Sequence, residues 1–512
     1  MLQTCGHSHY QTQIDQTGFF EETQDIDVSV SVVPEIQTTK RTLYTSYLGK
    51  VEIDVTGDSD TVGLEHYHTV GTKKLLIKIV DAQVYGLSAN QRYTVTKLQS
   101  LSAYKINVEK NKYHYILTLL AAKKLAQLAK DTEKLSKLEK LLTEFPVTDP
   151  LMVKATADHP SLVSPTPTKT VHDYKQIYQD VVKYNGPVEV LFNTHHFFDF
   201  LYEVSGMETV NNLSSVVSIC NVPKLDNAFF TGTYALYGNG AKTFYSLTCI
   251  DVVGHELSHG LVKGTADLEY KGHSGALNEF FADVMGVMFE FYMYKKFPNL
   301  MGEPDWFIGE DLGMNRPYLR DMINPNNGNQ PSKYHGKFYM NPNGKADYGG
   351  VHINSGICNH LFYLVCQKEG DKMMVLKTFI TCLTKLNDKS NFMDFRDTLK
   401  IVSNNNPVIV ECLNTVGFTA DAVSDYGSTQ PQRVPQPQRV PQPQPQRFPQ
   451  PQRFPQPQPQ RFPQPQRFPQ RFPQPQRFPQ HRPRQLPRGN YFGVEYYEDE
   501  DVEYYEDEDV EY

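Results

Sequence analysis

The sequence predicts an α+β protein with a β-rich N-terminal region, a mainly helical C-terminal region and a low-complexity tail. Residues 51–55 alternate apolar and polar side chains, which is typical of a half-buried strand. Leucines at helical spacing among Lys and Glu over residues 116–144 indicate an amphipathic helix. Residues 431–480 repeat Pro-Gln-Arg-Phe-Pro-Gln units, which favour extended polyproline II and cannot make a hydrophobic core.

These patterns divide the chain into five parts. A polar, irregular leader precedes a part that is predicted to form strands up to about residue 101, then the amphipathic helix and then a proline-rich connection over residues 146–167. From about residue 169 the chain alternates between helix and loop, and the last two parts are expected to be disordered. The predicted parts are residues 1–40, 41–168, 169–426, 427–490 and 491–512.

The amphipathic helix over residues 116–144 allows two readings. It could pack on the body of the protein, or it could form a coiled-coil dimer, and the short pattern favours packing on the body. Residues 41–168 also leave two alternatives open. They could be the β-rich half of one folded unit with the residues that follow, or a prosegment that is removed by cleavage.

Composition restricts the partners and the compartment. The net charge of −8 belongs to the body, because the arginine-rich part of the tail and its acidic end cancel. A negative body without a dense Lys/Arg face argues against nucleic acid as a partner. The apolar run 115–122 is far shorter than the ~20 residues that span a bilayer, and the N-terminus shows no signal peptide. We therefore expect no membrane span, and intracellular action or packaging in a particle.

The segment 255–259 reads His-Glu-Leu-Ser-His. Residues four apart lie on one face of a helix, so that His255 and His259 can present imidazole nitrogens to one metal ion, with Glu256 beside it. A catalytic zinc site needs a third protein ligand and keeps its fourth position for water. The segment therefore predicts part of a zinc site.

The missing ligand is predicted twenty residues later, in the segment 275–283, which reads Gly-Ala-Leu-Asn-Glu-Phe-Phe-Ala-Asp. Glu279 and Asp283 stand one helical turn apart. One carboxylate could therefore bind the metal while the other accepts the second N–H of a ligand histidine.

Together these segments resemble the thermolysin-like neutral zinc metalloproteases, whose first helix supplies two histidines and whose next helix supplies a glutamate. The resemblance implies a two-lobed fold with a β-rich N-terminal lobe and a mainly helical C-terminal lobe, and residues 169–426 as the zinc metalloprotease catalytic domain. It implies one catalytic zinc ion and Glu256 as the general base that activates water. The implied zinc ligands are His255, His259 and Glu279, and the implied supports of these ligands are Asn278 and Asp283.

Further catalytic residues follow from the same resemblance. Residues 347–356 (Asp-Tyr-Gly-Gly-Val-His-Ile-Asn-Ser-Gly) resemble the second signature of the family. This likeness implies that His352 helps to stabilise the transition state and that Asp347 orients it. Tyr270 stands where the family has an oxyanion-binding tyrosine.

Two segments resemble the substrate-binding parts of the family. Residues 226–230 are similar to the edge strand, which implies that the backbone of Asn227 and Ala228 pairs with a peptide. Arg320 stands where an arginine holds a substrate carbonyl. Leu319 and Val252 would line an apolar pocket for a bulky apolar residue just after the cut, although both could be simple core residues.

Four carboxylates stand where the family binds structural calcium, which takes hard oxygen ligands. Phe307 occupies a position that is often acidic, so we expect one calcium ion and not a pair. The four residues are Asp251, Glu290, Asp305 and Glu310.

The resemblance implies a zinc-dependent metalloendopeptidase that acts on peptide or protein substrates. The alternative is a catalytically weak zinc-bearing structural or interaction protein that acts through its tail. For the tail we expect a flexible extension, with docking to proline-recognising domains or to charged partners as the alternative.

Overall fold

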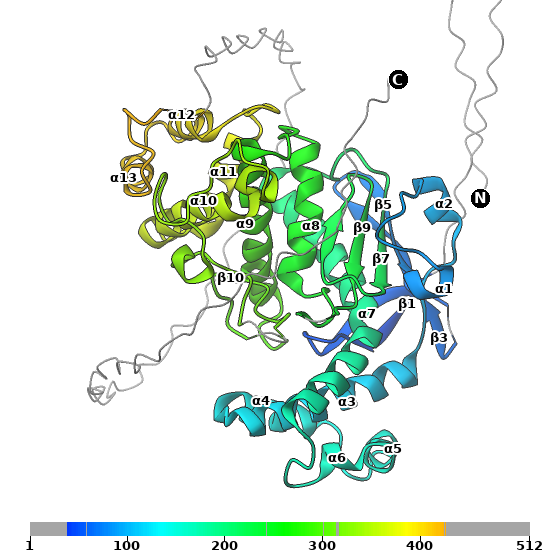
Figure 1. Cartoon of the computed structure of the whole chain (residues 1–512). Coiled ribbons are helices and arrows are strands. Elements are labelled where there is room, and N and C mark those ends of the chain that lie inside the picture. The colour runs from blue at the N-terminus through cyan, green and yellow to red at the C-terminus, as the bar shows by residue number, and fades with distance from the viewer. Residues whose placement is uncertain are drawn as a thin grey trace, which may run out of the picture. The chain divides into compact units, whose positions relative to one another are not determined.

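The computed structural model describes residues 38–57, 59–241, 243–300, 302–313, 317–423 and 425, all of which belong to one compact unit. Within this part of the chain, most of the strands precede residue 239 and helices dominate after residue 249 (Figure 1). This confirms the predicted fold class, a β-rich N-terminal part followed by a helical C-terminal part. The predicted parts 427–490 and 491–512, and all but the end of the predicted leader, lie outside the described residues.

A five-stranded sheet in the order β4-β5-β7-β9-β8 is the centre of the N-terminal part. The pairs β5 with β7 and β7 with β9 are parallel, whereas β4 with β5 and β8 with β9 are antiparallel. The edges of the sheet are therefore β4 and β8. The bounds are β4 Glu65–Val70, β5 Lys73–Asp81, β7 Ser215–Val222, β8 Ala228–Phe230 and β9 Tyr234–Gly238.

A second, antiparallel sheet has the order β1-β2-β3-β6. Its strand β2 contains the predicted alternation, because the valine and isoleucine side chains of β2 are buried and its charged ones are exposed. Short helices α1 (Ala82–Tyr85) and α2 (Val95–Ser100) follow β5, and β10 and β11 form a separate two-stranded pair. The strand bounds are β1 Thr38–Tyr44, β2 Lys50–Thr56, β3 Thr61–Gly63, β6 Lys105–Asn107, β10 Phe307–Ile308 and β11 Arg320–Asp321.

The five-stranded sheet crosses the boundary that we expected between residues 168 and 169. Strand β5 precedes this boundary and β7 follows it, yet the two pair over six residues from Leu76 with Ser215 to Asp81 with Cys220. Strands β7 and β9 lie in a region that we had predicted as helix and loop. Their residues are buried along their whole length, which is typical of central parallel strands. The two strands therefore lack the alternation of apolar and polar side chains that marks a half-buried strand.

The predicted amphipathic helix over residues 116–144 is wrong as a single helix. The structure has α3 (Val108–Ala129) and α4 (Thr132–Leu142) instead. Lys130 takes a left-handed conformation (φ 56°) that ends α3, and the Asp131 side chain accepts a hydrogen bond from the Lys134 amide, which begins α4. Leu138 of α4 and the apolar face of α3 pack in one buried cluster with α7 (Val171–Ser205), in agreement with packing on the body.

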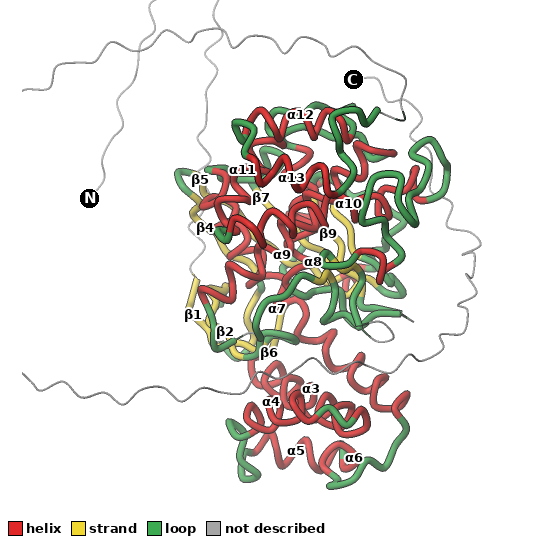
Figure 2. Tube along the Cα trace, turned by 90° about the vertical axis from the view of Figure 1, so that its left-hand side faces the viewer, coloured by secondary structure: helices red, strands yellow, loops and turns green. Residues whose placement is uncertain are grey.

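The proline-rich connection over residues 146–167 contains two helices that we had not predicted, α5 (Pro150–Asp158) and α6 (Pro160–Val163). Each begins with proline at its first turn, where the missing N–H costs no intrahelical bond. The Asp149 side chain caps α5 by accepting from the Leu151 amide at 2.8 Å. Figure 2 shows these helices grouped with α3 and α4 around one end of α7.

The helical C-terminal part is built on two long helices, α8 (Ile250–Lys263) and α9 (Gly272–Lys296). Aromatic rings of α7 pack on α9, with the ring centroids of Phe197 and Phe289 5.6 Å apart. The 3₁₀ helix η1 (Pro325–Gly328) and helices α10 (Asp347–Glu369), α11 (Lys372–Leu383), α12 (Phe392–Val402) and α13 (Pro407–Thr415) follow. Among the described residues, no helix is both long enough and apolar enough to cross a membrane.

Candidate functional site

Helices α8 and α9 come unusually close to each other at two glycines. A Cβ atom on Gly254 would lie 3.1 Å from the Cα of Gly286, and one on Gly286 would lie 2.5 Å from the Asp251 carbonyl oxygen. Only glycine permits this approach at both positions. It brings the face of α8 that carries the two histidines against the face of α9 that carries Glu279.

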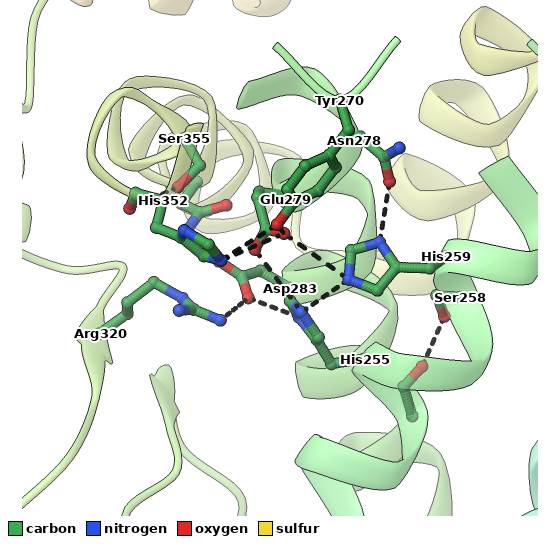
Figure 3. Close-up of polar contacts among 12 residues, drawn as sticks. His255, Ser258, His259, Tyr270, Asn278, Glu279, Asp283, Arg320, His352 and Ser355 are labelled. Atoms are coloured by element: carbon green, nitrogen blue, oxygen red, sulfur yellow. Dashed lines mark hydrogen bonds and ion pairs between the residues drawn. The ribbon is translucent and has the colours of Figure 1, made fainter. Parts of the chain in front are cut away.

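His255, His259 and Glu279 converge where these helices meet (Figure 3). The Nε2 atoms of the two histidines are 3.1 Å apart, and each lies 3.6 Å from a carboxylate oxygen of Glu279. The carboxylate is 1% exposed. The structure therefore brings together the three residues that the sequence predicted as zinc ligands.

The second nitrogen of each imidazole ring faces an acceptor on α9. Nδ1 of His255 lies 2.8 Å from Oδ1 of Asp283, and Nδ1 of His259 donates to Oδ1 of Asn278 at 2.8 Å. The Asn278 amide nitrogen donates to the Leu268 carbonyl, which turns its oxygen toward His259. With Nδ1 as the donor, each ring keeps its Nε2 lone pair free for a cation.

The charge of Glu279 is maintained despite its burial. Burial alone opposes ionisation, but His352, His255 and His259 lower the pKa of its carboxyl well below the usual value. A buried carboxylate beside two imidazole nitrogens is the ligand set of a catalytic zinc site with one open position. The residues present therefore fit zinc.

Glu256 lies beside these ligands on α8. Its side chain is buried and its Oε2 atom has no hydrogen-bond partner. Burial raises the pKa of Glu256 to about 7, while the charge of nearby His259 acts in the opposite direction. A carboxyl group with this pKa can both accept and release a proton near neutral pH.

A tight left-handed turn interrupts the first residues of the range given for α10, just before His352. Tyr348, Gly349 and Gly350 have φ values of 47°, 85° and 79°, and a Cβ atom on Gly349 would lie 2.2 Å from the Pro342 carbonyl oxygen. The turn lets Asp347 cap the helix that follows, because its Oδ2 accepts from the His352 amide at 2.9 Å. The other carboxylate oxygen accepts from Nδ1 of His352 at 2.6 Å.

His352 and Tyr270 meet above Glu279. The Tyr270 hydroxyl lies 3.1 Å from Nε2 of His352 and donates to Oε1 of Glu279. Burial lowers the pKa of His352, but Glu279 and Asp347 more than offset this and raise it to about 9. Both side chains are partly exposed, so that each can reach a bound substrate.

Arg320 lies on β11 and reaches Asp283. Its Nη2 atom is 2.6 Å from Oδ1 of Asp283, the oxygen that also faces His255. The other oxygen of Asp283 accepts from Nδ2 of Asn359 on α10 at 2.8 Å. Sequence reasoning missed Asn359, which lies 76 residues from Asp283 and is part of no local motif.

Strand β8 forms the open edge of the five-stranded sheet. The Asn227 carbonyl accepts from the Gly238 amide, and the Thr231 amide donates to the Tyr234 carbonyl. The alternation of an antiparallel ladder then turns the N–H and C=O of Ala228 away from β9. The N–H and C=O of Ala228 thus face away from β9, whereas the Asn227 carbonyl is bound within the sheet.

A loop next to this edge is held by Asp226, a contact that sequence reasoning did not assign. The Asp226 carboxylate accepts from the backbone amides of Ala241, Thr243 and Phe244 at 2.8 to 3.1 Å.

The two residues that we expected to line an apolar pocket belong to the hydrophobic core. Val252 is a buried member of the main hydrophobic cluster, and Leu319 packs at the margin of the same cluster.

Three of the four predicted calcium ligands come together. Glu290, Asp305 and Glu310 each offer an oxygen within 4.8 Å of the others. Oε2 of Glu290 and Oε2 of Glu310 are buried without a hydrogen-bond partner, which fits an oxygen-ligated cation. Burial and the nearby Asp251 raise the pKa of Glu290 to about 10 and that of Glu310 to about 11.

Asp251 is not part of this three-residue group. Its carboxylate accepts from the amides of Val252 and Gly309, so it anchors the loop that carries Glu310. Phe307, which occupies a position that is often acidic in the family, stacks on Tyr318 with ring centroids 4.5 Å apart.

Two family models match this chain. Residues 41–263 match the catalytic domain of the thermolysin metallopeptidases, and residues 266–406 match the α-helical domain of the same family. The first of these matches spans residue 168, where we expected a boundary, and contains all strands of the five-stranded sheet.

Several named bacterial proteases are similar to part of this chain. Neutral protease NprE of Bacillus pumilus is 33% identical over 216 residues, which are 41% of this chain and 68% of that protein. Bacillolysin of Bacillus subtilis (strain 168) is 33% identical over 41% of this chain and 39% of its own length. Thermolysin of Alicyclobacillus acidocaldarius subsp. acidocaldarius is 41% identical over 28% of this chain and 25% of its own length.

Proposed function

Because the chain belongs to the thermolysin metallopeptidase family, and is thus a zinc metalloendopeptidase by class, we propose that it cleaves peptide bonds at the centre formed by His255, His259 and Glu279. One observation supports this proposal most strongly. The two Nε2 atoms and the buried Glu279 carboxylate converge beside Glu256, whose Oε2 has no hydrogen-bond partner.

The chemistry divides between the cation and the side chains. A zinc ion held by these ligands would act as a Lewis acid and lower the pKa of water to about 7. Glu256 accepts the proton of the attacking water and passes it to the leaving amine nitrogen. Burial raises the pKa of its carboxyl above the ordinary value, which favours uptake of the proton.

Two donors stabilise the oxygen that gains negative charge as the carbonyl is attacked. The Tyr270 hydroxyl and Nε2 of His352 lie 3.1 Å from each other above the ligands, so that one substrate oxygen can reach both. Asp347 keeps Nδ1 of His352 occupied as a donor and stabilises the protonated ring.

We further propose that the substrate binds as an extended strand beside β8. The outward-facing N–H and C=O of Ala228 pair with its backbone, and the exposed Asn227 side chain and the Arg320 guanidinium contact substrate carbonyl groups. Leu319 and Val252 favour a bulky apolar residue just after the scissile bond. A panel of peptides that differ only at that residue tests this preference.

Residues 41–168 belong, in our proposal, to the catalytic unit and are not a prosegment. The parallel pairing of β5 with β7 supports this assignment, since removing β5 would expose one side of a central strand. One structural calcium ion at Glu290, Asp305 and Glu310 completes the proposed cofactors.

The alternative function is a zinc-bearing structural or interaction protein with weak catalysis, acting through its tail. Casein digestion separates the two. We expect digestion that stops with a zinc chelator and returns when zinc is added. A purified protein that carries zinc at this centre and cleaves neither casein nor the peptide panel would support the alternative.

A further inference from the structure

A second group of imidazole side chains lies at the edge of the five-stranded sheet opposite to β8. His66 and His68 are alternate residues of β4, so both point to its buried face, where they are 2% and 9% exposed. His195 and Asp199 stand one turn apart on α7 and face them. None of these residues takes part in the catalytic centre.

The ring nitrogens of this cluster are as close as those of the catalytic ligands. Nε2 of His66 lies 2.9 Å from Nδ1 of His195, compared with 3.1 Å between the Nε2 atoms of His255 and His259. One ring nitrogen of each of His66, His68 and His195 lies within 4.8 Å of the other two. Two nitrogens bound to one tetrahedral zinc ion at the usual distance are about 3.3 Å apart. The spacing of His66 and His195 is therefore close to the one that a tetrahedral ion requires, and a nitrogen of His68 lies within 4.8 Å of both.

A carboxylate supports one of these rings as Asp283 supports His255. Oδ1 of Asp199 lies 2.8 Å from Nε2 of His68, the same distance as in the catalytic pair. A donor Nε2 leaves Nδ1 of His68 as the nitrogen with a free lone pair. The second carboxylate oxygen accepts from Lys296 at 2.9 Å and lies 3.3 Å from Nδ1 of His196, so it is already occupied.

A hydrogen bond between two neutral imidazoles would use one N–H and one lone pair. It would not account for a third imidazole, His68, whose ring centroid lies 3.8 Å from that of His195.

We propose that His66, His68 and His195 form a second binding site, for a divalent transition metal of the zinc type, which ties the edge strand β4 to helix α7. Imidazole nitrogen is a ligand that zinc, copper and nickel share, and zinc is the ion tested first. Asp199 orients His68, and Lys296 balances the charge of Asp199. The ion at this site is structural and takes no part in peptide cleavage.

Metal content of the full chain tests this proposal. Proteins are equilibrated at buffered nanomolar free zinc and bound zinc is measured by mass spectrometry. We expect two zinc ions per chain in the wild type and one in the His255→Gln/His259→Gln variant. We expect one in His66→Gln/His195→Gln, with cleavage of a small peptide retained, and none when all four residues are replaced. His114→Gln, a half-buried histidine that stacks on Tyr184, is the matched control and should keep two.

Cobalt provides a second measurement that needs no change in the cluster. Co²⁺ added to the His255→Gln/His259→Gln variant should give the visible absorption of a nitrogen-ligated tetrahedral ion, and adding His66→Gln to that variant should remove it. The proposal is overturned if the folded His255→Gln/His259→Gln variant binds neither zinc nor cobalt. It is also overturned if the bound metal is unchanged by His66→Gln/His195→Gln. Neither outcome depends on whether the catalytic centre cleaves peptides.

Discussion

Oδ1 of Asp283 lies 2.8 Å from Nδ1 of His255. Asp283 is completely buried, which opposes its ionisation, but Arg320 and His255 lower the pKa of its carboxyl below the usual value. A charged acceptor behind a ligand histidine fixes the tautomer of the ring and increases its basicity. The strength of metal binding should therefore depend on a residue that does not touch the metal.

Replacing Asp283 with Asn should weaken zinc binding about 10 to 100-fold, because the ring of His255 loses its charged acceptor. Competition with a chromophoric chelator measures this affinity. Asp180→Asn, at an exposed position of α7, should leave it unchanged. Equal zinc affinity in Asp283→Asn and the wild type would contradict the assigned role.

Replacing Tyr270 with Phe or His352 with Gln should lower kcat by about 10²- to 10³-fold, because each change removes one donor to the oxygen that gains charge. Zinc content should stay at the wild-type level in both variants, since neither residue is among the proposed ligands. Tyr202→Phe, on the exposed face of α7, is the control and should keep full activity. A loss of zinc with the loss of activity would show that the two residues support the metal instead.

The proposed calcium site implies an unusual pH dependence of stability. Burial and the nearby Asp251 raise the pKa values of Glu290 and Glu310 well above the ordinary value of 4.5, so the folded protein without calcium holds protons that the unfolded chain releases. Its stability should therefore fall as pH rises from about 5 to 9. Bound calcium replaces these protons, so the rise in Tm that calcium produces should grow over the same range.

Thermal unfolding with and without calcium at several pH values checks this prediction. Glu290→Gln should abolish most of the calcium-dependent rise in Tm, whereas Glu303→Gln, at an exposed position, should not. A calcium effect that is independent of pH in the wild type would refute the assigned ligands.

The sequence predicted the parts of the site that are encoded locally. The histidine pair of α8 and the Glu279–Asp283 pair of α9 each lie within one helical turn, where side-chain direction follows from spacing alone. Contacts between distant segments were not predictable. Asn359 reaches Asp283 across 76 residues, and His66 reaches His195 across 129. No periodicity relates such pairs. The packing of α10 on α9 brings Asn359 to Asp283, and the packing of α7 on β4 brings His195 to His66.

The break between α3 and α4 and the strands β7 and β9 were not predicted, and each has a physical reason. Lys130 ends α3 in a left-handed conformation that non-glycine residues seldom adopt, so a continuous leucine pattern concealed two helices. Strands β7 and β9 are buried on both faces and lack the alternation by which β2 was recognised.

Deleting residues 428–512 should leave the cleavage of a small peptide within about twofold of the full chain, because the catalytic residues and their contacts all precede that point. The deletion retains Asp425, which accepts a hydrogen bond from Tyr339 and pairs with His335 at 2.9 Å. A large fall in kcat/KM on the small peptide would show that the tail contributes to peptide cleavage.

The most direct test of the proposed mechanism is the kcat/KM of Glu256→Gln on a peptide substrate, measured together with its zinc content. Glutamine keeps the size of the side chain and removes the proton acceptor. We predict zinc binding equal to that of the wild type and a fall in kcat/KM of about 10³-fold or more. Glu133→Gln, at an exposed position of α4, should behave as the wild type. A Glu256→Gln protein that binds zinc and retains a tenth or more of the wild-type kcat/KM would contradict the mechanism.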